Sequence, residues 1–319
     1  MRRIAILKTC NEQETAFLRA SVEQEDALFF FESEEALSSM SDRIDIILGE
    51  PSMETVLSMK SLRWIQMTWA GANKYTSAGN FPPHVTLTSA SGAFGGVISE
   101  HVLAGILALY KNLLTYRTQL QKGQWQLLSG DATLEGKRAL ILGTGNIGQE
   151  TAKKLKAFGA YTVGICRNCR EIPAFFDECY TVSALDTQLP TADLLIIALP
   201  GTKETRGLLD RTRIGMLKRS AILVNVGRGF VVDTEALTCA LEKGNLRGAV
   251  LDVTDPEPLP PDHRLRFLDN VILTPHVSGI SWGENQFTRQ RILEIFRENL
   301  RRDSQGIPLK NVIDFISGY

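Results

Sequence analysis

Three side chains able to bind and protonate an acid substrate each follow a short apolar run. Arg228 comes after the run AILVN, Glu257 after GAVLD, and His276 after VILT. Histidine exchanges a proton near neutral pH, and a nearby carboxylate favours its protonated form. Arginine presents a planar fork of donors that matches a carboxylate and stabilises an oxyanion. Together they suit the reduction of a 2-keto acid, because the carbonyl oxygen gains charge as hydride reaches the carbon and must then receive a proton.

Each of these residues also has a plainer interpretation. Arg228 could be a surface arginine, Glu257 a loop acid beside prolines, and His276 a capping or core histidine. The apolar runs before them predict parallel strands, and open parallel sheets bind ligands beyond the carboxyl ends of their strands. Three such residues at one sheet edge therefore favour a common site.

A glycine-rich turn is expected at the same edge. The run RALIL (138–142) leads directly into GTGNIG (143–148) and then into a helical pattern. In a dinucleotide-binding turn the glycines allow a tight bend, close approach to the pyrophosphate and close helix–strand packing, and the helix N-terminus meets the phosphates. A glycine turn alone can be structural, but the strand before it and the helix after it favour nucleotide binding. The residues assigned to it are Gly143, Thr144, Gly145, Asn146, Ile147 and Gly148.

The cofactor that this turn would hold is predicted to carry a 2′-phosphate. An Asp or Glu about 20 residues after the turn normally binds the ribose of NAD. Here that position is Cys166, and no acid lies between Glu150 and Glu171. Arg167 and Asn168, with Arg170 as a further candidate, could bind the phosphate through charge-assisted hydrogen bonds. NADP(H) is therefore the expected cofactor, with NAD(H) as the alternative; a solvated arginine loop is the plainer interpretation.

Cys166 and Cys169 have two other interpretations, as a redox pair or as half of a zinc site. A redox Cys-x-x-Cys normally opens a helix of a thioredoxin-like unit, whereas this one follows the second strand of a dinucleotide fold. No second cysteine pair or suitably spaced histidine accompanies it, so no metal site is expected. His101 is interpreted separately, as a residue on the surface of a long helix.

The elements that would position these residues form two series of short apolar runs alternating with helical patterns. The first series comprises RIAIL (3–7), ALFFF (27–31), IDIIL (44–48) and RWIQM (63–67); the second comprises RALIL (138–142), YTVGI (161–165), LLIIA (194–198), AILVN (221–225), GAVLD (248–252) and VILT (271–274). Helices are expected at 97–121, 149–158, 233–243 and 283–302. The alternation predicts an α/β fold with two doubly wound parallel-sheet domains, one a flavodoxin-like substrate domain and one a Rossmann dinucleotide-binding domain, with a cleft between them.

The domain boundaries follow from composition. The Gly/Ser-rich segment TLTSASGAFGG (86–96) is interpreted as a connector. The C-terminal helical pattern is expected to pack back on the first domain. The substrate domain is therefore predicted at 1–95 plus 284–319, and the dinucleotide-binding domain at 96–283.

Bulk composition restricts the partners and the compartment. With 35 Lys and Arg against 36 Asp and Glu, the 319 residues give no electrostatic reason to expect nucleic acid or a membrane surface. The apolar run Ile4–Leu7 is too short for a signal peptide, and Val102–Tyr110 is too short to cross a bilayer. Five scattered cysteines do not form a disulfide framework. A cytoplasmic protein is expected.

Five segments occur in the order and approximate spacing of one family: LILGTGNIGQ, ALPGTKETRGLL, NVGRGFVVDTEAL, LDVTDPEPLP and TPHVSG. In these segments the chain resembles, over nearly its whole length, the D-isomer-specific 2-hydroxyacid dehydrogenases, and among them the NADP-preferring glyoxylate/hydroxypyruvate reductases. The resemblance implies that Arg228 binds the substrate's carboxylate and carbonyl, and that His276 is the acid/base and pairs with Glu257. It also implies that Asp252 contacts the nicotinamide carboxamide. Further cofactor contacts are implied for Pro200, Thr205 and Val226.

The resemblance extends to the substrate loop and to assembly. It implies that backbone N–H groups of Trp69, Ala70, Gly71 and Ala72 receive the substrate's carboxylate. It implies a homodimer built through the helix from about residue 97 and the arm to Trp125, with hinges near 93–97 and 279–284. Trp69 is bulkier than the family pattern, so no particular 2-keto acid is transferred to this chain.

Two rival functions stay open. One is a nonenzymatic dinucleotide-binding scaffold, such as the corepressors that share this architecture. The other is a dehydrogenase of formate or phosphite with the same fold. The intact set of Arg228, Glu257 and His276 favours catalysis, and the chain has no long basic tail of the kind a scaffold would use.

Overall fold

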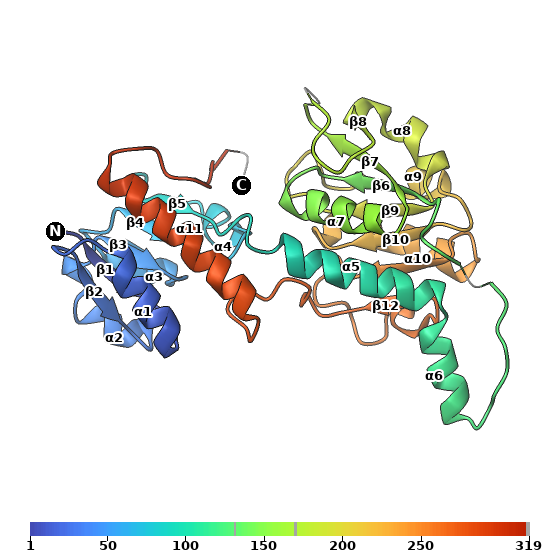
Figure 1. Cartoon of the computed structure of the whole chain (residues 1–319), viewed down its shortest axis with the longest axis horizontal. Helices are drawn as coiled ribbons and strands as arrows, with labels where there is room; N and C mark the ends of the chain where they lie inside the picture. Colours follow the sequence, from blue (N-terminus) through green and yellow to red (C-terminus); the bar gives the residue numbers. More distant parts are fainter. Residues whose placement is uncertain (131, 169–170, 317–319) are drawn as a thin grey trace. The chain divides into compact units, whose positions relative to one another are not determined.

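The computed structural model describes residues 1–130, 132–168 and 171–316, and the chain divides into two units (Figure 1). The first unit comprises Met1–Phe94 and Ile280–Tyr319, and the second comprises Gly95–Gly279. From the sequence, the boundaries are predicted after residues 95 and 283. Each unit holds a parallel sheet with helices, which confirms the predicted α/β fold of two parallel-sheet domains.

Within the described residues, the first unit is built on a five-stranded parallel sheet in the order β2-β1-β3-β4-β5. The strands are β1 (Arg3–Ile6), β2 (Ala27–Phe30), β3 (Ile46–Leu48), β4 (Trp64–Gln66) and β5 (Thr86–Thr88). The helices are α1 (Glu12–Ser21), α2 (Glu34–Ser38), α3 (Met53–Ser58), α4 (Asn73–Thr76), α11 (Gln286–Ser304) and the 3-10 helix η1 (Ser41–Arg43). This strand order is that of flavodoxin-like sheets, as predicted.

Strand β5 corrects the interpretation of residues 86–96 as a connector. Its three residues pair in parallel with β4, Thr86 beside Trp64 and Thr88 beside Gln66. The segment has two threonines and one leucine, so it offers no apolar run that sequence periodicity can recognise. Only its position beside β4 makes it a strand.

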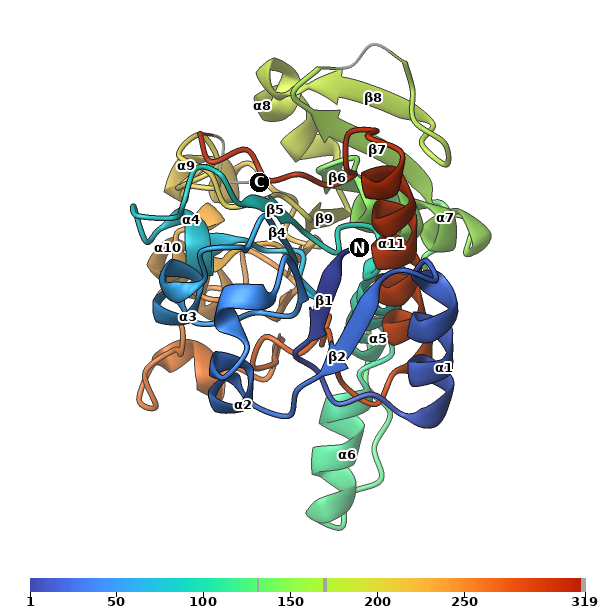
Figure 2. The same ribbon diagram turned by 90° about the vertical axis from the view of Figure 1, so that its left-hand side faces the viewer.

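The C-terminal helix α11 packs on the first unit. Its residues Leu293, Phe296 and Leu300 are buried in one cluster with Ile4 and Ile6 of β1. The helix lies beside α1, and both views show the two side by side (Figure 2). An amphipathic pattern with one apolar face therefore explains why the chain returns to its first sheet.

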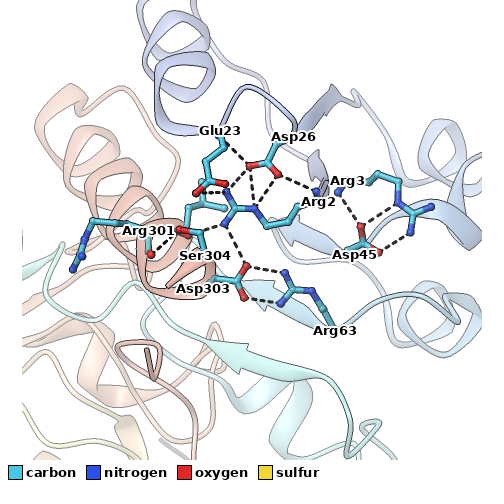
Figure 3. Close-up of polar contacts among 10 residues, drawn as sticks. Arg2, Arg3, Glu23, Asp26, Asp45, Arg63, Arg301, Asp303 and Ser304 are labelled. Atoms are coloured by element: carbon cyan, nitrogen blue, oxygen red, sulfur yellow. Dashed lines mark hydrogen bonds and ion pairs between the residues drawn. The ribbon is translucent and has the colours of Figure 1, made fainter. Parts of the chain in front are cut away.

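A network of ion pairs connects the C-terminal end of α11 to the first unit (Figure 3). Asp303 accepts hydrogen bonds from both terminal nitrogens of Arg63, at 2.6 and 2.7 Å, and lies 3.4 Å from Nη1 of Arg2. Arg2 also forms an ion pair with Asp26. Burial tends to raise the pKa of Asp303, but the hydrogen bonds and charges of Arg63 and Arg2 outweigh it and hold that pKa below its ordinary value.

Within the described residues, the second unit has a seven-stranded parallel sheet in the order β12-β11-β10-β9-β6-β7-β8. The strands are β6 (Arg138–Leu142), β7 (Tyr161–Cys166), β8 (Glu178–Thr181), β9 (Leu194–Ile197), β10 (Ile222–Asn225), β11 (Gly248–Leu251) and β12 (Val271–Leu273). The α-helices are α5 (Gly95–Tyr110), α6 (Leu113–Gln121), α7 (Asn146–Ala157), α8 (Leu185–Gln188), α9 (Arg211–Gly215) and α10 (Thr234–Glu242). The 3-10 helices are η2 (Val182–Ala184), η3 (Leu189–Thr191), η4 (Gly229–Val231) and η5 (Arg264–Phe267).

Two features of the second unit differ from the strands and helices that the sequence predicts. The edge strand β8 makes seven strands rather than six within the described residues; its sequence ECYT is only partly buried and has no apolar run. The helix expected over 97–121 is two helices, because Asn112 adopts φ 54 between α5 and α6. Asparagine tolerates this left-handed conformation, so the apolar periodicity continues while the helix axis turns.

Helix α6 and the segment after it extend away from the sheet of the second unit (Figure 1). The segment includes Trp125 and Leu127, whose surfaces are 91% and 94% exposed. In the described part of the chain, no single helix has both the length and the hydropathy needed to span a bilayer; α5 and α6 reach them only as a pair bent by 58°.

Candidate active site

The predicted site residues of the second unit follow the carboxyl ends of its parallel strands. The glycine turn follows β6, Cys166 ends β7, and the loop from Pro200 follows β9. Arg228 and Glu257 come after β10 and β11, and His276 comes after β12. The strand order reverses between β6 and β9, which is where doubly wound sheets bind their ligands.

The glycine turn has the local geometry that its sequence requires. Gly143 adopts φ 100, and a Cβ there would lie 2.6 Å from the carbonyl oxygen of Ala198. A Cβ on Gly148 would lie 1.9 Å from the carbonyl oxygen of Gly143, so helix and strand pack at a distance that only glycine allows. Gly145 precedes α7 and faces open space, and no side chain caps the helix N-terminus. The turn therefore leaves backbone N–H groups directed at a space that can hold phosphates.

The remaining turn residues connect it to its surroundings. The side chain of Asn146 accepts a hydrogen bond of 2.9 Å from the N–H of Gly95, at the start of α5. The side chain of Gln149 donates to the carbonyl of Thr144 at 3.0 Å. Ile147 is half-buried in the first turn of α7. These contacts fix the turn on the second unit.

The end of β7 presents the residues predicted to select the cofactor. Cys166 is half-buried, and Arg167 and Asn168 are exposed. Hydrogen bonding from Thr202 is the main cause that holds the pKa of Glu204 below its ordinary value, and the charge of Arg167 makes a smaller contribution in the same direction. Cys169 and Arg170, the other residues that the sequence analysis weighed here, lie outside the described residues.

The loop after β9 is closed by Thr205. Its hydroxyl donates to the carbonyl of Pro200 at 2.9 Å and accepts the N–H of Thr202 at 2.9 Å. Val226 follows β10 as a buried residue whose N–H donates to the carbonyl of Ile197 at 3.1 Å. Pro200, Thr205 and Val226 thus belong to two adjacent loops at the same sheet edge.

Arg228 is held by its neighbours and is partly buried. Asn225 donates from its side chain to the carbonyl of Arg228 at 3.0 Å, and Arg228 donates from Nη1 to the carbonyl of Gly227 at 2.8 Å. Burial lowers the pKa of its guanidinium, and the charge of Glu257 partly opposes this. A desolvated cation of this kind gains more from an anionic ligand than one in water does.

Glu257 and His276 form a direct pair. Nδ1 of His276 lies 2.6 Å from Oε1 of Glu257, and both side chains are about half exposed. The backbone of His276 has φ 55, an uncommon conformation for this residue type, and its N–H donates to the carbonyl of Asp252 at 2.9 Å. Because Nδ1 is engaged by the carboxylate, Nε2 is the ring atom available to a substrate.

Asp252 shapes the loop that carries His276. Its carboxylate is buried, with 1% of the residue exposed, and accepts hydrogen bonds from the hydroxyl of Thr274 and the N–H groups of Val277 and Ser278 at 2.6 to 2.9 Å. Burial tends to raise the pKa of Asp252, but these hydrogen bonds hold it below its ordinary value. In this structure Asp252 therefore acts on the loop, in addition to the nicotinamide contact implied by the resemblance.

Sequence reasoning missed two members of this network. The sequence indicates Thr274 only as the end of a strand, and His101 only as a residue on the surface of a helix. Nε2 of His101 lies 3.3 Å from the hydroxyl of Thr274, which itself donates to Asp252. The segment TPHVSG contained the signal for Thr274, but only the tertiary structure brings His101 of α5 to it.

A pocket of about 510 Å³ opens beside the acid–base pair. It is lined by Asp252, Thr254, Glu257, Pro258, Leu259, Arg266, Leu273, Thr274, Pro275 and His276. Carboxylate, imidazole and apolar side chains thus share one recess at the ends of β11 and β12.

The predicted substrate loop belongs to the first unit, directly after β4. Trp69 is partly exposed, and its carbonyl accepts the N–H of Ala90 at 2.8 Å. Within the described residues, the N–H groups of Ala70 and Gly71 donate to no backbone carbonyl. The loop therefore has donors available for an anion. Among the described residues, no group of three or more His, Cys, Asp or Glu side chains is placed to hold a metal ion.

Comparison with known proteins gives a consistent result. Residues 103–278 match the family model of the D-isomer specific 2-hydroxyacid dehydrogenase NAD binding domain. A glyoxylate reductase of Aeropyrum pernix is 35% identical over 72% of this chain and 70% of its own length. A D-isomer specific 2-hydroxyacid dehydrogenase family protein of Aeromonas salmonicida has 34% identity and a TM-score of 0.88 over 98% of this chain and 99% of its own. A D-isomer specific 2-hydroxyacid dehydrogenase of Xanthobacter autotrophicus, solved with NADPH and MES, has 26% identity and a TM-score of 0.83 over 100% and 99%.

Proposed function

Because the chain belongs to the D-isomer specific 2-hydroxyacid dehydrogenases, a family of NAD(P)-dependent oxidoreductases, we propose that it transfers hydride between NADP(H) and a small 2-keto acid, giving the D-2-hydroxy acid. One observation carries the proposal: a His276–Glu257 pair at 2.6 Å stands at the same sheet edge as the desolvated Arg228. This set combines a proton donor with an anion-binding cation, the two functions that keto-acid reduction requires.

The second unit fits a dinucleotide cofactor. The uncapped N-terminus of α7 and the open space at Gly145 suit a pyrophosphate, which a side chain at that position would obstruct. When bound, NADPH supplies the hydride. Pro200, Thr205 and Val226 are proposed to line the rest of the cofactor site, and Asp252 to contact the nicotinamide carboxamide.

The preference for NADP(H) over NAD(H) is part of the proposal. Arg167 and Asn168 are exposed at the end of β7, where NAD-binding members of such folds carry an acid. A guanidinium there attracts a 2′-phosphate, whereas a carboxylate would repel it. The Xanthobacter relative, solved with NADPH, is consistent with this choice.

The proposed mechanism assigns one task to each catalytic side chain. Arg228 binds the carboxylate of the keto acid and stabilises charge on its carbonyl oxygen. His276 donates a proton from Nε2 to that oxygen as hydride arrives at the carbon. Glu257 accepts from Nδ1, which fixes the ring orientation and leaves Nε2 for the substrate. In the oxidative direction His276 accepts the proton.

The loop Trp69–Ala72 is proposed to receive the substrate's carboxylate through its N–H groups. The unpaired donors of Ala70 and Gly71 support this role. Trp69 would then contact the side chain of the keto acid. Its bulk and flat face favour a planar or apolar substituent, so phenylpyruvate belongs in the first substrate panel beside glyoxylate and hydroxypyruvate.

We also propose that the protein is a homodimer assembled through α5, α6 and the arm to Trp125. Large apolar side chains are exposed along this region, and exposed apolar patches of this kind mark association surfaces. They are Leu113, Leu114, Leu120, Trp125 and Leu127.

The test is a substrate panel measured with both cofactors. Loss of nicotinamide absorbance from NADPH with glyoxylate, hydroxypyruvate or phenylpyruvate is the expected result, with slower loss from NADH. Reduction of NAD or NADP by formate or phosphite, without keto-acid turnover, would instead assign the rival dehydrogenase function. Binding of NADPH without turnover of any of these acids would favour the nonenzymatic scaffold.

A further inference from the structure

We propose that Glu50 is a positioning residue whose carboxylate holds the first end of the Trp69–Ala72 loop. The proposal rests on the substrate-binding role proposed for that loop. Glu50 follows β3 and Gly49, and only 8% of the residue is exposed. It is not among the residues that the sequence analysis selected.

The side chain of Glu50 holds the first end of the loop. Its Oε1 accepts the N–H of Thr68 at 2.5 Å and the hydroxyl of Thr68 at 3.0 Å. Thr68 is fully buried and directly precedes Trp69. A carboxylate that accepts two hydrogen bonds from one residue fixes both the backbone and the side chain of that residue.

The backbone beside Glu50 holds the other end. Nζ of Lys74 donates to the carbonyl of Glu50 at 2.7 Å, and the hydroxyl of Tyr75 donates to the carbonyl of Pro51 at 2.8 Å. Both donors belong to α4, which begins directly after the loop. The ammonium of Lys74 also lies 5.9 Å from the ring centre of Trp69, within cation–π range. Residues 50 and 51 thus hold the segment before the loop and the segment after it.

The charge of Glu50 is balanced from a third element. Nζ of Lys8, after β1, lies 2.6 Å from Oε2 of Glu50, and the Glu50 side chain is 4% exposed. A buried ion pair is costly to desolvate and contributes little stability compared with apolar packing, so a charged group here is better explained by geometry than by stability. The carboxylate joins β1, β3 and the substrate loop at one point.

The first measurement uses steady-state kinetics to distinguish a positioning role of Glu50 from a role in folding. In Glu50→Ala we expect the KM for the keto acid to rise roughly tenfold, with kcat and the KM for NADPH within about twofold, because ground-state and transition-state binding are lost together. Glu50→Gln keeps an acceptor for Thr68 and should recover most of that loss. Glu34→Ala is the matched control, since Glu34 accepts hydrogen bonds from Ser52 and Thr55 in the same unit without contacting the loop.

The second measurement needs no turnover. Hydrogen–deuterium exchange of peptides covering 69–72 should quicken in Glu50→Ala and stay unchanged in Glu34→Ala. Unchanged exchange and an unchanged KM for the keto acid in folded Glu50→Ala would overturn the proposal, as would equal effects of Glu34→Ala. If the wild-type protein reduces no keto acid, the proposed function fails, while the exchange experiment still decides whether Glu50 holds the loop.

A separate observation supports a second inference, that Cys166 and Cys179 form a dithiol site oxidised by hydroperoxides. Sγ of Cys166 lies 3.6 Å from Sγ of Cys179, and both thiols are half-buried. The register pairs Gly164 with Cys179, so the thiols project from the same face of neighbouring strands. This pair is not the Cys166–Cys169 pair, for which the sequence favours neither a redox role nor a zinc site.

The chemistry balances with one named oxidant. A hydroperoxide oxidises one thiol to a sulfenic acid and leaves as the alcohol or water; the second thiol then displaces water to form the disulfide. The sulfurs must approach by roughly 1.5 Å to reach bonding distance. Strand β8 is at the edge of the sheet, and Cys166 is the last residue of β7, so this movement breaks few contacts. It would displace the adjacent Arg167.

Peroxide treatment followed by non-reducing peptide mapping tests this inference. We expect a Cys166–Cys179 link, a roughly tenfold weaker affinity for NADPH, and reversal of both by dithiothreitol. Cys179→Ser should abolish both the disulfide and the loss of NADPH affinity on oxidation. Cys239→Ser, at a half-buried thiol elsewhere in the unit, should retain both the disulfide and the loss of affinity. A Cys166–Cys169 link, or no link, would overturn the assignment. A Cys166–Cys179 disulfide that leaves the affinity for NADPH unchanged would show that oxidation does not regulate cofactor binding. The affinity of the reduced protein for NADPH separately tests the proposed cofactor site.

Discussion

The two ring nitrogens of His276 have different environments, and this difference supports a division of tasks. Nδ1 is engaged by Glu257 at 2.6 Å, and the loop that carries the ring is fixed by Asp252. The ring is therefore oriented before a substrate arrives, which lowers the cost of reaching the reactive geometry.

Replacement of the ring tests this role. His276→Ala should lower kcat roughly 10²- to 10⁴-fold, because a positioned acid/base contributes about that much. The affinity for NADPH should stay within about twofold, as measured by calorimetry. His263→Ala is a close control, since Nε2 of His263 lies 2.9 Å from Glu235 in the same unit but outside the proposed site. Near-normal turnover by His276→Ala would contradict the mechanism.

Arg167 is the residue to test for cofactor choice. A lost charge-assisted hydrogen bond costs about 1.5–3 kcal/mol, so Arg167→Ala should lower the ratio of NADPH to NADH affinity by roughly 10- to 100-fold. Fluorescence titration with each cofactor measures the ratio. Arg211→Ala, at an exposed position on α9, should leave it unchanged. An unaltered ratio in Arg167→Ala would remove the basis for NADP preference.

At the scale of elements, the positions of strands decide which residues meet. Six strands of the second unit place their following loops at one edge, so residues up to 133 positions apart, from Gly143 to His276, share that edge. The structure adds β8 beside β7, which brings Cys179 to Cys166. The break at Asn112 turns α6 away from α5 and leads the chain into the exposed arm.

The exposed arm after α6 leads to a prediction about the oligomeric state of one double variant. Trp125→Asp with Leu127→Asp should convert a dimer into a monomer in light scattering, because a tryptophan at the centre of an interface contributes about 2 kcal/mol or more and each 1.4 kcal/mol is about tenfold in Kd. Phe287→Asp, at an 83% exposed position of α11, is the matched control and should not change the mass. A monomeric wild-type protein would contradict the proposed assembly.

At the scale of the whole molecule, the chain leaves the first unit after Phe94 and re-enters it at Ile280. The returning helix α11 is held by apolar packing and by Asp303, which contacts Arg2 before β1 and Arg63 before β4. Segments that lie on either side of the second unit in the sequence therefore stabilise each other.

The ion pairs of Asp303 predict that the stability difference between the wild type and an Asp303 variant depends on pH. The folded pKa of Asp303 lies below its ordinary value of 3.8, so its stabilising contribution is complete above about pH 4 and is lost as pH falls through the lowered pKa. Asp303→Asn should reduce the free energy of unfolding of the first unit by roughly 1.5–3 kcal/mol at pH 7, toward the lower end because Arg63 is partly exposed.

Urea titrations of both proteins at pH 7 and pH 3, followed by tryptophan fluorescence, measure this difference. The gap between wild type and Asp303→Asn should narrow at pH 3. Glu25→Gln, at an exposed position of the same unit, should change the free energy of unfolding little at either pH. A gap that does not change with pH would show that Asp303 stabilises the unit through packing and not through its charge.

The sequence by itself determined the features that depend on local order. Apolar runs and helical patterns identified ten strands and the major helices, and the glycine turn, with Arg228, Glu257 and His276, could be selected from their neighbours along the chain. The parallel-sheet fold and the family were confirmed. The cofactor preference and the individual residue roles stay predictions.

The tertiary structure alone decided which distant residues meet. Strands β5 and β8 lack apolar runs and are recognised only by pairing with β4 and β7. Likewise Glu50 reaches Thr68, His101 reaches Thr274, and Cys166 reaches Cys179 through folding and not through spacing. The physical reason is that periodicity reports the burial of an element's own face, whereas the partner of a polar side chain depends on the order and register in which the strands assemble.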